Sequence, residues 1–323
     1  MAPRRTRLLL GLLVCAGLAR TVPAVAAASD YDVFYDQFRG LTPDSSKVAA
    51  VSSLELARDA GIIVLEEGRL ALCSPVAGRV CAAVFQGHGV FAFAPPTAVE
   101  RGQLERFYGV KALRRAFTSA CFIFGDSTLA ELSGTLAFGP GAVGEESRKT
   151  LSGAVRGLVH EKARAIEVSI GHPLLEGRRC GLFFAIFDSP KSDPVAFEIS
   201  PLHREQVMLL RPVRDAAEGL MGPARFEVVN QFPRADDTTS VAAFDRSPTV
   251  AIRQVTADCT IAGAPAFAAR ASLDFESLED GQRWLPLTLD AMLQVRRAAW
   301  GDGRPAAWHK GERERQPALS ILE

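Results

Sequence analysis

One pair of neighbouring residues has the right types for metal chemistry. His160 and Glu161 lie in the run HEKAR, inside a segment that predicts a helix. The HExxH helix of zinc enzymes carries two histidines one turn apart, which reach the same metal, and a glutamate that activates the water. Here Arg164 stands at the second histidine position, and its positive charge would repel a metal ion. We therefore expect His160 and Glu161 to be ordinary residues on a polar helix face.

The other histidines and the serines form no recognisable constellation. The remaining histidines are dispersed along the chain, at His88, His172, His203 and His309. A zinc site built from distant residues stays open, because sequence spacing does not reveal it. There is no Gly-x-Ser-x-Gly elbow and no phosphate-binding loop, and Ser127 and Ser133 lack a local partner. A triad need not be local in sequence. We predict no catalytic, cofactor-binding or metal-ligating residue in this chain.

Neighbouring carboxylates are the last candidates for chemistry. They occur at Glu66-Glu67, Glu145-Glu146 and Asp236-Asp237, beside turn signals or at a predicted helix start. Two acids that act on a glycosidic bond must lie on opposite sides of it, which sequence alone does not establish. We expect these pairs to be solvated charges.

The cysteines allow one disulfide prediction. Cys73 and Cys81 flank SPVAGRV, which predicts a turn, so the two thiols could face each other across a hairpin and be oxidised outside the cytoplasm. The alternative is that they are buried thiols, as the apolar runs around Cys121 and Cys180 also indicate. The separation of Cys73 and Cys81 does not match a CxxC zinc knuckle.

The elements that would position these residues are mostly strands. Short apolar runs alternate with turn signals from Val51 to Pro96, which predicts a β-meander. The predicted breaks fall at 59–61, 66–68, 77–79 and 86–89. Further strands are predicted in the apolar runs at 117–126, GLFFAIFD, VAFEIS, QVMLLRPV and ARFEVVNQF. We interpret residues 45–233 as one β-rich, mostly antiparallel domain.

Two helices interrupt this domain. Residues 97–109 predict a short helix, with Thr97 as N-cap and Glu100 completing a capping box. Residues 143–165 predict the longest helix of the chain. Its apolar stripe consists of Leu151, Val155, Leu158 and Val159.

The C-terminal part has a different β pattern. Residues 234–248 are polar and predict a linker, and 249–323 predict an incomplete antiparallel β-sandwich. One strand alternates cleanly, with Phe267, Ala269, Ala271, Leu273 and Phe275 on one face. The last residues look like the start of another strand, which would leave a sheet edge unpaired. We therefore expect 249–323 to be less stable than 45–233. The predicted fold class is mainly β with minor α.

The N-terminus predicts export. Arginines at positions 4, 5 and 7 precede the apolar run Leu8–Leu18, which is too short to cross a membrane. Ala26 and Ala28 form an A-x-A site, so residues 1–28 predict a signal peptide cleaved before Ser29, leaving 29–44 as an N-terminal arm or short helix. The alternative is an uncleaved anchor. We expect a periplasmic or extracellular protein with no transmembrane span after cleavage.

Composition excludes two function classes. The formal net charge is zero, which argues against nucleic-acid binding because phosphate neutralisation needs a basic surface. Nearly half the residues (48%) are hydrophobic, so a disordered chain is not expected.

Three stretches carry a family resemblance. RDAGIIVLEEGRLALCSPVAGRVCAAVFQGHGVFAFAPPTAVERGQLERFYG, LEDGQRWLPLTLD and WGDGRPAAWHKGERE resemble the N-terminal part of exported bacterial M1-family metallopeptidases, the membrane alanyl aminopeptidase-like gluzincins. In those proteins an extra β-rich domain precedes the β-sandwich "saddle". The resemblance runs from about residue 30 to the C-terminus and makes 249–323 the start of the saddle-like domain.

The resemblance implies zinc aminopeptidase chemistry only for a complete family member. The HExxH motif would follow the saddle, and neither it nor the Gly-x-Met-Glu-Asn motif occurs here. It therefore implies a non-catalytic N-terminal portion with a scaffolding or substrate-access role, no zinc of its own, and a missing or separately encoded catalytic domain as partner. The alternative is a free-standing exported β-sandwich module that binds a peptide, glycan or protein. An enzyme with an unrecognised active site is the third reading.

Overall fold

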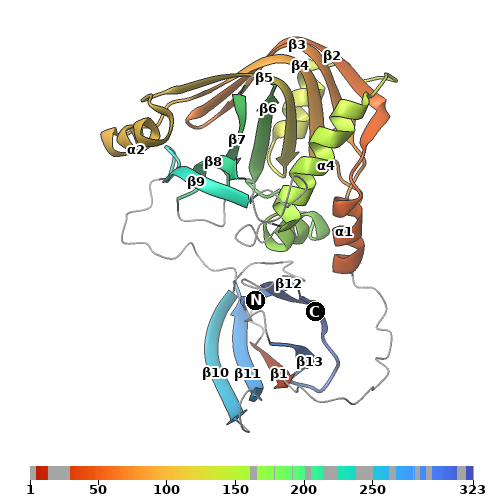
Figure 1. Ribbon diagram of the computed structural model, residues 1–323. Helices are drawn as coiled ribbons and strands as arrows, with labels where there is room; N and C mark the ends of the chain where they lie inside the picture. The colour runs from red at the N-terminus through yellow and green to blue at the C-terminus, as the bar shows by residue number, and fades with distance from the viewer. Residues whose placement is uncertain are drawn as a thin grey trace. The chain divides into compact units, whose positions relative to one another are not determined.

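The computed structural model describes most of the chain. The described residues are 5–13, 30–160, 166–177, 179–190, 192–200, 205–213, 225–237, 250–261, 267–278, 280, 284–288, 293–310 and 318–322. The chain divides into two compact units. The larger unit is Phe34–Phe244, and the smaller unit combines Met1–Val33 with Asp245–Glu323. Both are built on antiparallel sheets with few helices, which confirms a mainly β fold with minor α (Figure 1).

An eight-stranded sheet forms the larger unit. Each strand pairs with the next one in sequence, in the order β2 to β9, and every pair is antiparallel. The predicted meander is therefore confirmed, and it continues through the whole unit. The strands are β2 (Pro43–Arg58), β3 (Gly61–Cys73), β4 (Ala82–Phe93), β5 (Leu113–Phe124), β6 (Phe183–Ser189), β7 (Ser192–Ile199), β8 (Val207–Val213) and β9 (Arg225–Phe232).

Two of the predicted turns are wrong, and the reason is physical. Residues 66–68 and 86–89 lie inside β3 and β4, where the pairing register shifts at a bulge. Gly68 and Gly87 face each other there, with φ of 158° and 154°. A Cβ on Gly87 would lie 2.1 Å from the Glu67 carbonyl oxygen. Glycine therefore marks a close approach of two backbones rather than a chain reversal.

The bulges let the long strands bend. Register shifts occur in the β2–β3, β3–β4 and β4–β5 pairs. A bulge increases local twist and curvature. Figure 1 shows β2 to β5 as long arched strands above the shorter β6 to β9.

The bend encloses a phenylalanine-rich core. Phe91 of β4 stacks on Phe187 of β6 with ring centroids 4.5 Å apart, and it also contacts Phe197 of β7 at 5.5 Å. Phe93 reaches Phe232 of β9 at 5.9 Å. These rings are at most 2% exposed. One face of all eight strands contributes to this core, together with the helix residues Leu104 and Leu132.

Short helices lie around the sheet. They are α1 (Asp30–Arg39), α2 (Ala98–Tyr108), α3 (Thr128–Thr135), α4 (Glu145–His160), a π-helical turn (Glu167–Gly171) and α5 (His172–Leu175). The predicted helix at 97–109 is confirmed as α2, with Thr97 as its N-cap. Its hydroxyl accepts a hydrogen bond from the Val99 N–H, not the Glu100 N–H that the predicted capping box requires. Gly109 ends α2 in the left-handed conformation, with φ of 71°.

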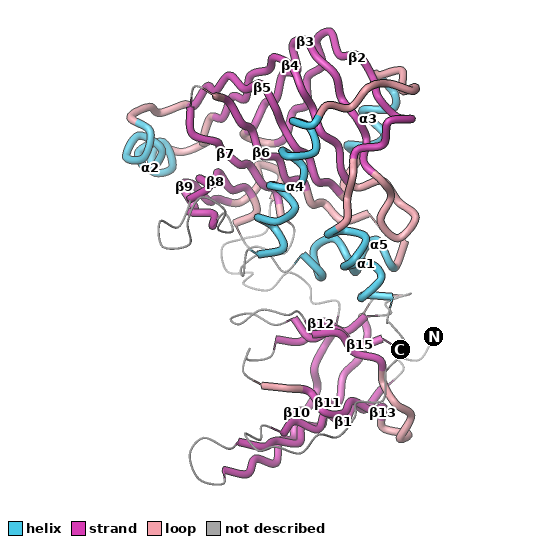
Figure 2. Tube along the Cα trace, turned by 45° about the vertical axis from the view of Figure 1, so that its right-hand side comes forward, coloured by secondary structure: helices cyan, strands magenta, loops and turns pink. Residues whose placement is uncertain are grey.

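Helix α4 covers part of the second face. The prediction of a helix here is confirmed, and Leu151, Val155 and Leu158 are each less than 5% exposed. The helix contacts β4 and β5, and Figure 2 shows it crossing the sheet. The strand alternation places Ile186 on this face, because its neighbours Ala185 and Phe187 both belong to the phenylalanine-rich core.

The smaller unit contains two sheets with a modest core. The strand orders are β10-β11-β1-β13 and β12-β15-β14. The bounds are β1 (Arg5–Leu13), β10 (Val250–Ile261), β11 (Phe267–Ser277), β12 (Trp284–Thr288), β13 (Val295–Trp300), β14 (Ala307–Lys310) and β15 (Ala318–Leu322). As the alternation predicts, Leu273 and Phe275 of β11 pack into this core, where Phe275 contacts Trp300. In the described part of the chain, no helix is long and apolar enough to cross a membrane.

The N-terminal apolar run has a place in this sheet. Arg5–Leu13 forms β1, antiparallel to both β11 and β13. The expected cleavage site before Ser29 lies outside the described residues. The signal peptide therefore stays a prediction, and the first part of its apolar run, Leu8–Leu13, lies in a central strand. The predicted linker is described only up to Asp237.

Candidate functional site

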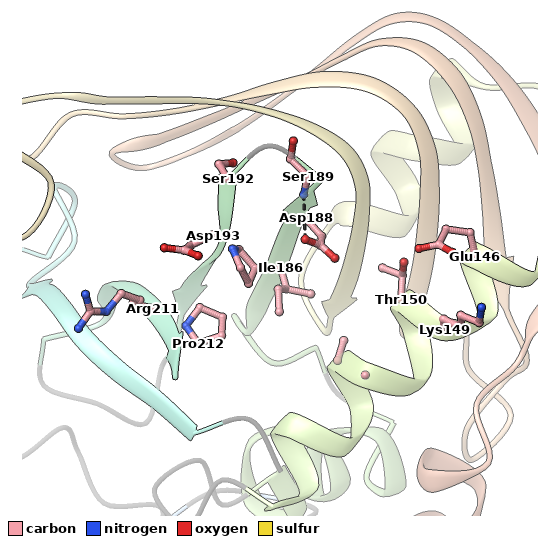
Figure 3. A pocket seen from close by; sticks show the side chains of 13 residues that line it. Glu146, Lys149, Thr150, Ile186, Asp188, Ser189, Ser192, Asp193, Arg211 and Pro212 are labelled. Carbon is pink, nitrogen blue, oxygen red and sulfur yellow. Dashed lines mark hydrogen bonds between the residues drawn. The ribbon is translucent and has the colours of Figure 1, made fainter. Parts of the chain in front are cut away.

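A groove of about 700 Å³ lies on the face of the large sheet that α4 covers. Its walls come from α4 on one side and from β6, β7 and β8 on the other (Figure 3). The lining residues include the charged Glu146, Lys149, Asp188, Asp193 and Arg211, with Ile186, Ala154, Pro194 and Pro212 as the main apolar ones.

The first half of α4 supplies one wall. Helix periodicity places Glu146, Lys149 and Thr150 on one side of α4, opposite the stripe that faces the sheet. Glu146 and Lys149 are exposed, and neither makes an ion pair with another described residue. Gly153 and Ala154 follow one turn later and leave room for a ligand, because their side chains are small. This side of α4 thus presents one acidic and one basic side chain next to the small residues Gly153 and Ala154.

The β6–β7 hairpin supplies two carboxylates. Ser189 pairs with Ser192 where the hairpin turns, so Asp188 and Asp193 flank the turn on neighbouring strands. Asp188 accepts a hydrogen bond from the Ser189 N–H at 2.8 Å, and Figure 3 shows its carboxylate extending toward α4. Asp193 lies on the side of Arg211 (Figure 3). Both aspartates are exposed, so a ligand can reach them.

Arg211 is engaged by its own neighbours. Its guanidinium donates to the Glu227 carboxylate on β9, and this hydrogen bond raises the pKa of Arg211 above its ordinary value. The guanidinium also lies 5.7 Å from the centre of the Phe107 ring. Because Arg211 is already paired, it adds less positive charge to the groove than a free arginine would.

Tyr108 lies beside this ion pair. Burial raises the pKa of its hydroxyl, with the nearby cations Arg115 and Arg211 acting in the opposite direction. Arg115 lies over the Tyr108 ring at 5.3 Å. The hydroxyl is buried and has no hydrogen-bond partner among the residues that the structure describes. Tyr108 therefore stays protonated at neutral pH, and its side chain packs against the phenylalanine-rich core.

The groove as a whole suits recognition of a cationic ligand. Three carboxylates (Glu146, Asp188 and Asp193) face one unpaired ammonium, Lys149, and one arginine that is already neutralised. Its floor is apolar, which suits the carbon stem of a lysine or arginine side chain. No group of three or more His, Cys, Asp or Glu in the described residues is arranged to hold a metal ion.

A second cavity of about 470 Å³ contains Ser127, which the sequence singled out. Ser127 donates a 2.6 Å hydrogen bond to Glu131, one turn later in α3. Burial acts to raise the pKa of Glu131, but the hydrogen bonds from Ser127 and Arg58 lower it overall. The expectation that Ser127 lacks a local partner is therefore wrong: its partner is an ionised carboxylate that an arginine also contacts. Ser133 lines the same cavity.

A buried arginine network holds this second region together. Arg58, at the end of β2, lies 3.2 Å from Asp126 and 3.0 Å from Glu131. It also donates to the Thr128 hydroxyl at 2.8 Å and lies 4.9 Å above the Phe183 ring. Its side chain is only 10% exposed. Sequence reasoning missed this network because seventy residues separate Arg58 from Thr128, and no local pattern links them.

The structure does not bring the described histidines together. His160 ends α4, while its neighbour Glu161 and Arg164 lie outside the described residues, as does His203. His88 lies in β4 opposite Glu67. The other two are in separate units: His172 is buried in α5, and His309 is in β14.

The predicted Cys73–Cys81 disulfide is not present. Both thiols are free and fully buried. Leu72 pairs with Ala83, so the residue that follows in the register opposite Cys73 is Ala82, and Cys81 lies just before β4. Burial raises the pKa of Cys81 to about 12, and the same cause raises the pKa of Cys121 to about 12. These thiols are therefore protonated and unreactive in the folded unit.

Comparison of the chain with protein-family models, curated proteins and solved structures finds no match. The resemblance to M1-family peptidases thus stays a prediction from the quoted sequence stretches.

Proposed function

We propose that the larger unit is a non-catalytic binding module whose site is the groove between α4 and β6–β8. The observation that carries the proposal is a set of exposed carboxylates that line a groove with an apolar floor. Asp188 extends toward α4 and Asp193 lies on the side of Arg211. The other sheet face is filled by phenylalanine rings, so this is the face that can accept a ligand.

The proposed ligand is an extended peptide segment with a lysine or arginine side chain. Cationic heads would lie at Asp188 and at Asp193, and their carbon stems would lie on Ile186 and Pro212. Charge-assisted hydrogen bonds to carboxylates are about twice as strong as neutral ones. A glycan without charge would not use these carboxylates in the same way.

The test is peptide binding with a charge-neutral control. The probe is a fluorescent hexapeptide containing two lysines, and the control is the same peptide with both lysines acetylated. We expect Asp188→Asn combined with Asp193→Asn to weaken binding of the lysine peptide at least tenfold. Asp280→Asn, an exposed change in the smaller unit, should leave affinity unchanged. Equal binding of the two peptides, or no loss in the double variant, would refute the proposal.

The same experiment tests the absence of catalysis. After prolonged incubation with the purified chain, mass spectrometry should find the hexapeptide intact, with no dependence on added zinc. Stoichiometric zinc binding together with peptide cleavage would show that the chain is an enzyme and would refute the proposal of a non-catalytic module.

We further propose that the module is exported and acts beside a peptidase catalytic domain. The basic start, the short apolar run and the Ala26-x-Ala28 site support export with cleavage before Ser29. The quoted resemblance supports an M1-like zinc aminopeptidase as partner, with the groove presenting peptide to it. An HExxH-encoding frame directly downstream would support this pairing, and a downstream region without one would favour a free-standing module.

A further inference from the structure

The four-stranded sheet of the smaller unit depends on β1. Residues Arg5–Leu13 pair with β11 over their whole length, from Arg5 opposite Glu276 to Leu13 opposite Ala268. On its other side β1 pairs with β13, from Leu8 opposite Trp300 to Leu12 opposite Val295. Strands β11 and β13 do not pair with each other, so β1 is the sole link between them in the described sheet.

Strand β1 occupies the space between β11 and β13, which we call the slot, and the floor of this slot is apolar. Neighbouring strands lie about 4.8 Å apart, so β11 and β13 stand about two strand spacings apart. Below them, Leu273 of β11 and Ala298 of β13 are less than 9% exposed and belong to one core. The rings of Phe275 and Trp300, one from each side of the slot, are 6.3 Å apart.

The strand in the slot is also the segment predicted to leave. Residues 5–13 contain the basic start and most of the apolar run of the proposed signal peptide. Cleavage before Ser29 removes this strand. The facing edges of β11 and β13 then expose unpaired backbone N–H and C=O groups above an apolar floor, a state that favours pairing with another strand.

We propose that the slot between β11 and β13 accepts an extended apolar strand from another polypeptide, inserted antiparallel to both. The inference rests on the proposed cleavage before Ser29. Strand addition at a sheet edge draws affinity from main-chain hydrogen bonds on one side. Here the inserted strand satisfies two edges at once and covers the apolar floor, so an apolar nine-residue segment fits it better than a polar one.

The probe is a synthetic peptide with the sequence RTRLLLGLL of residues 5–13, carrying a solubilising tag and a fluorophore. Its partner is the chain that begins at Ser29. We expect binding by anisotropy, together with slower hydrogen exchange of backbone amides in 267–277 and 295–300. The control peptide carries Leu9→Pro, which removes one N–H and cannot continue a central ladder. It should bind at least tenfold more weakly.

A second variant keeps the test decisive if the chain starting at Ser29 leaves its smaller unit unfolded. In the full chain, Leu9→Pro disrupts β1 without deleting it, and this variant should bind the peptide while the unchanged full chain does not. The proposal is overturned if the peptide gives no protection in β11 and β13 with either protein. It is also overturned if Leu9→Pro in the peptide has no effect.

Two other outcomes distinguish a failure of the proposed cleavage from a failure of the proposed strand insertion. Mass spectrometry of the exported protein that finds the chain starting at Met1 refutes the cleavage, and then β1 fills the slot within its own chain. Concentration-dependent dimers of the Ser29 chain, with β11 and β13 protected before any peptide is added, assign the slot to a second copy and overturn the proposed occupant.

Discussion

The two units are both antiparallel β structures, but they are buried to very different depths. In the larger unit, long bent strands enclose a core in which rings such as Phe91, Phe93 and Phe197 are at most 1% exposed. In the smaller unit, β10 is exposed along nearly its whole length, and Val255 is 58% exposed. The difference shows that alternation of apolar and polar residues is enough to specify strands. A stable sheet also needs a second layer of structure that buries its apolar face.

The first prediction concerns which of the two units unfolds at lower denaturant concentration. All three tryptophans, Trp284, Trp300 and Trp308, lie in the smaller unit. We expect the tryptophan fluorescence transition to fall at lower denaturant than the main circular-dichroism transition. Limited proteolysis should remove the region 249–323 and leave 45–233 intact. Survival of 249–323 after loss of 45–233 would reverse the comparison.

Truncating one aromatic ring in each unit compares how much each core contributes to stability. Phe91→Ala removes a fully buried ring that touches Phe187 and Phe197, and should lower the free energy of unfolding by about 3–5 kcal/mol. Phe275→Ala removes a partly buried ring and should cost about 1–2 kcal/mol, since exposed surface contributes less. Chemical denaturation followed by circular dichroism and fluorescence measures both. Equal costs would mean that the two cores are equally tight.

The bulges of the larger unit offer a matched pair of glycine substitutions. In Gly87→Ala the new Cβ meets the Glu67 carbonyl at 2.1 Å, and overpacking together with backbone strain should cost about 3 kcal/mol. Gly102→Ala in α2 meets nothing within 4 Å and should be neutral or stabilising by up to about 1 kcal/mol. Thermal unfolding distinguishes them, and a harmless Gly87→Ala would show that the bulge tolerates a side chain.

The arginine network of the larger unit predicts a pH dependence. The pKa of Glu131 is lowered in the folded state, so its ionised form stabilises the fold above the ordinary pKa of 4.5. That contribution is lost as the pH falls through the lowered pKa. Glu131→Gln should therefore cost about 0.5–1 kcal/mol at pH 7, because the side chain is partly exposed and screened.

The dependence of stability on pH in the acidic range is the control for this prediction. The stabilities of Glu131→Gln and the unchanged chain should converge as the pH falls through the lowered pKa of Glu131, and Glu55→Gln, an exposed change in β2, is the matched control for loss of one carboxylate. A constant difference from pH 7 to pH 3 would contradict the role of the ionised carboxylate.

Cysteine labelling is the smallest perturbation and compares the units directly. Cys259 is exposed in the smaller unit, while Cys73, Cys81, Cys121 and Cys180 are buried in the larger one. In the chain that begins at Ser29, a maleimide should react at once with Cys259 and with the other four only after unfolding. If two thiols stay unlabelled after unfolding without reductant, a disulfide such as Cys73–Cys81 has formed in the protein.

Local features of the sequence determined much of this fold. The helix at 145–160, the N-cap at Thr97 and the alternating strand at 267–275 are all visible in the sequence, because each depends on neighbours within a few residues. Turn signals were less decisive. A Gly-containing run indicates an unusual backbone, and whether it reverses the chain or forms a bulge depends on the strand that lies beside it.

Only the tertiary structure decided which residues meet. Arg58 joins Asp126 and Glu131 although it lies far from them in sequence, and Glu146 meets the Asp188 side of the groove because α4 crosses the sheet. The same holds for β1, whose apolar run alone predicts a leader, while the sheet gives it two antiparallel neighbours. Such contacts follow from long-range packing, which closes loops that no local pattern encodes.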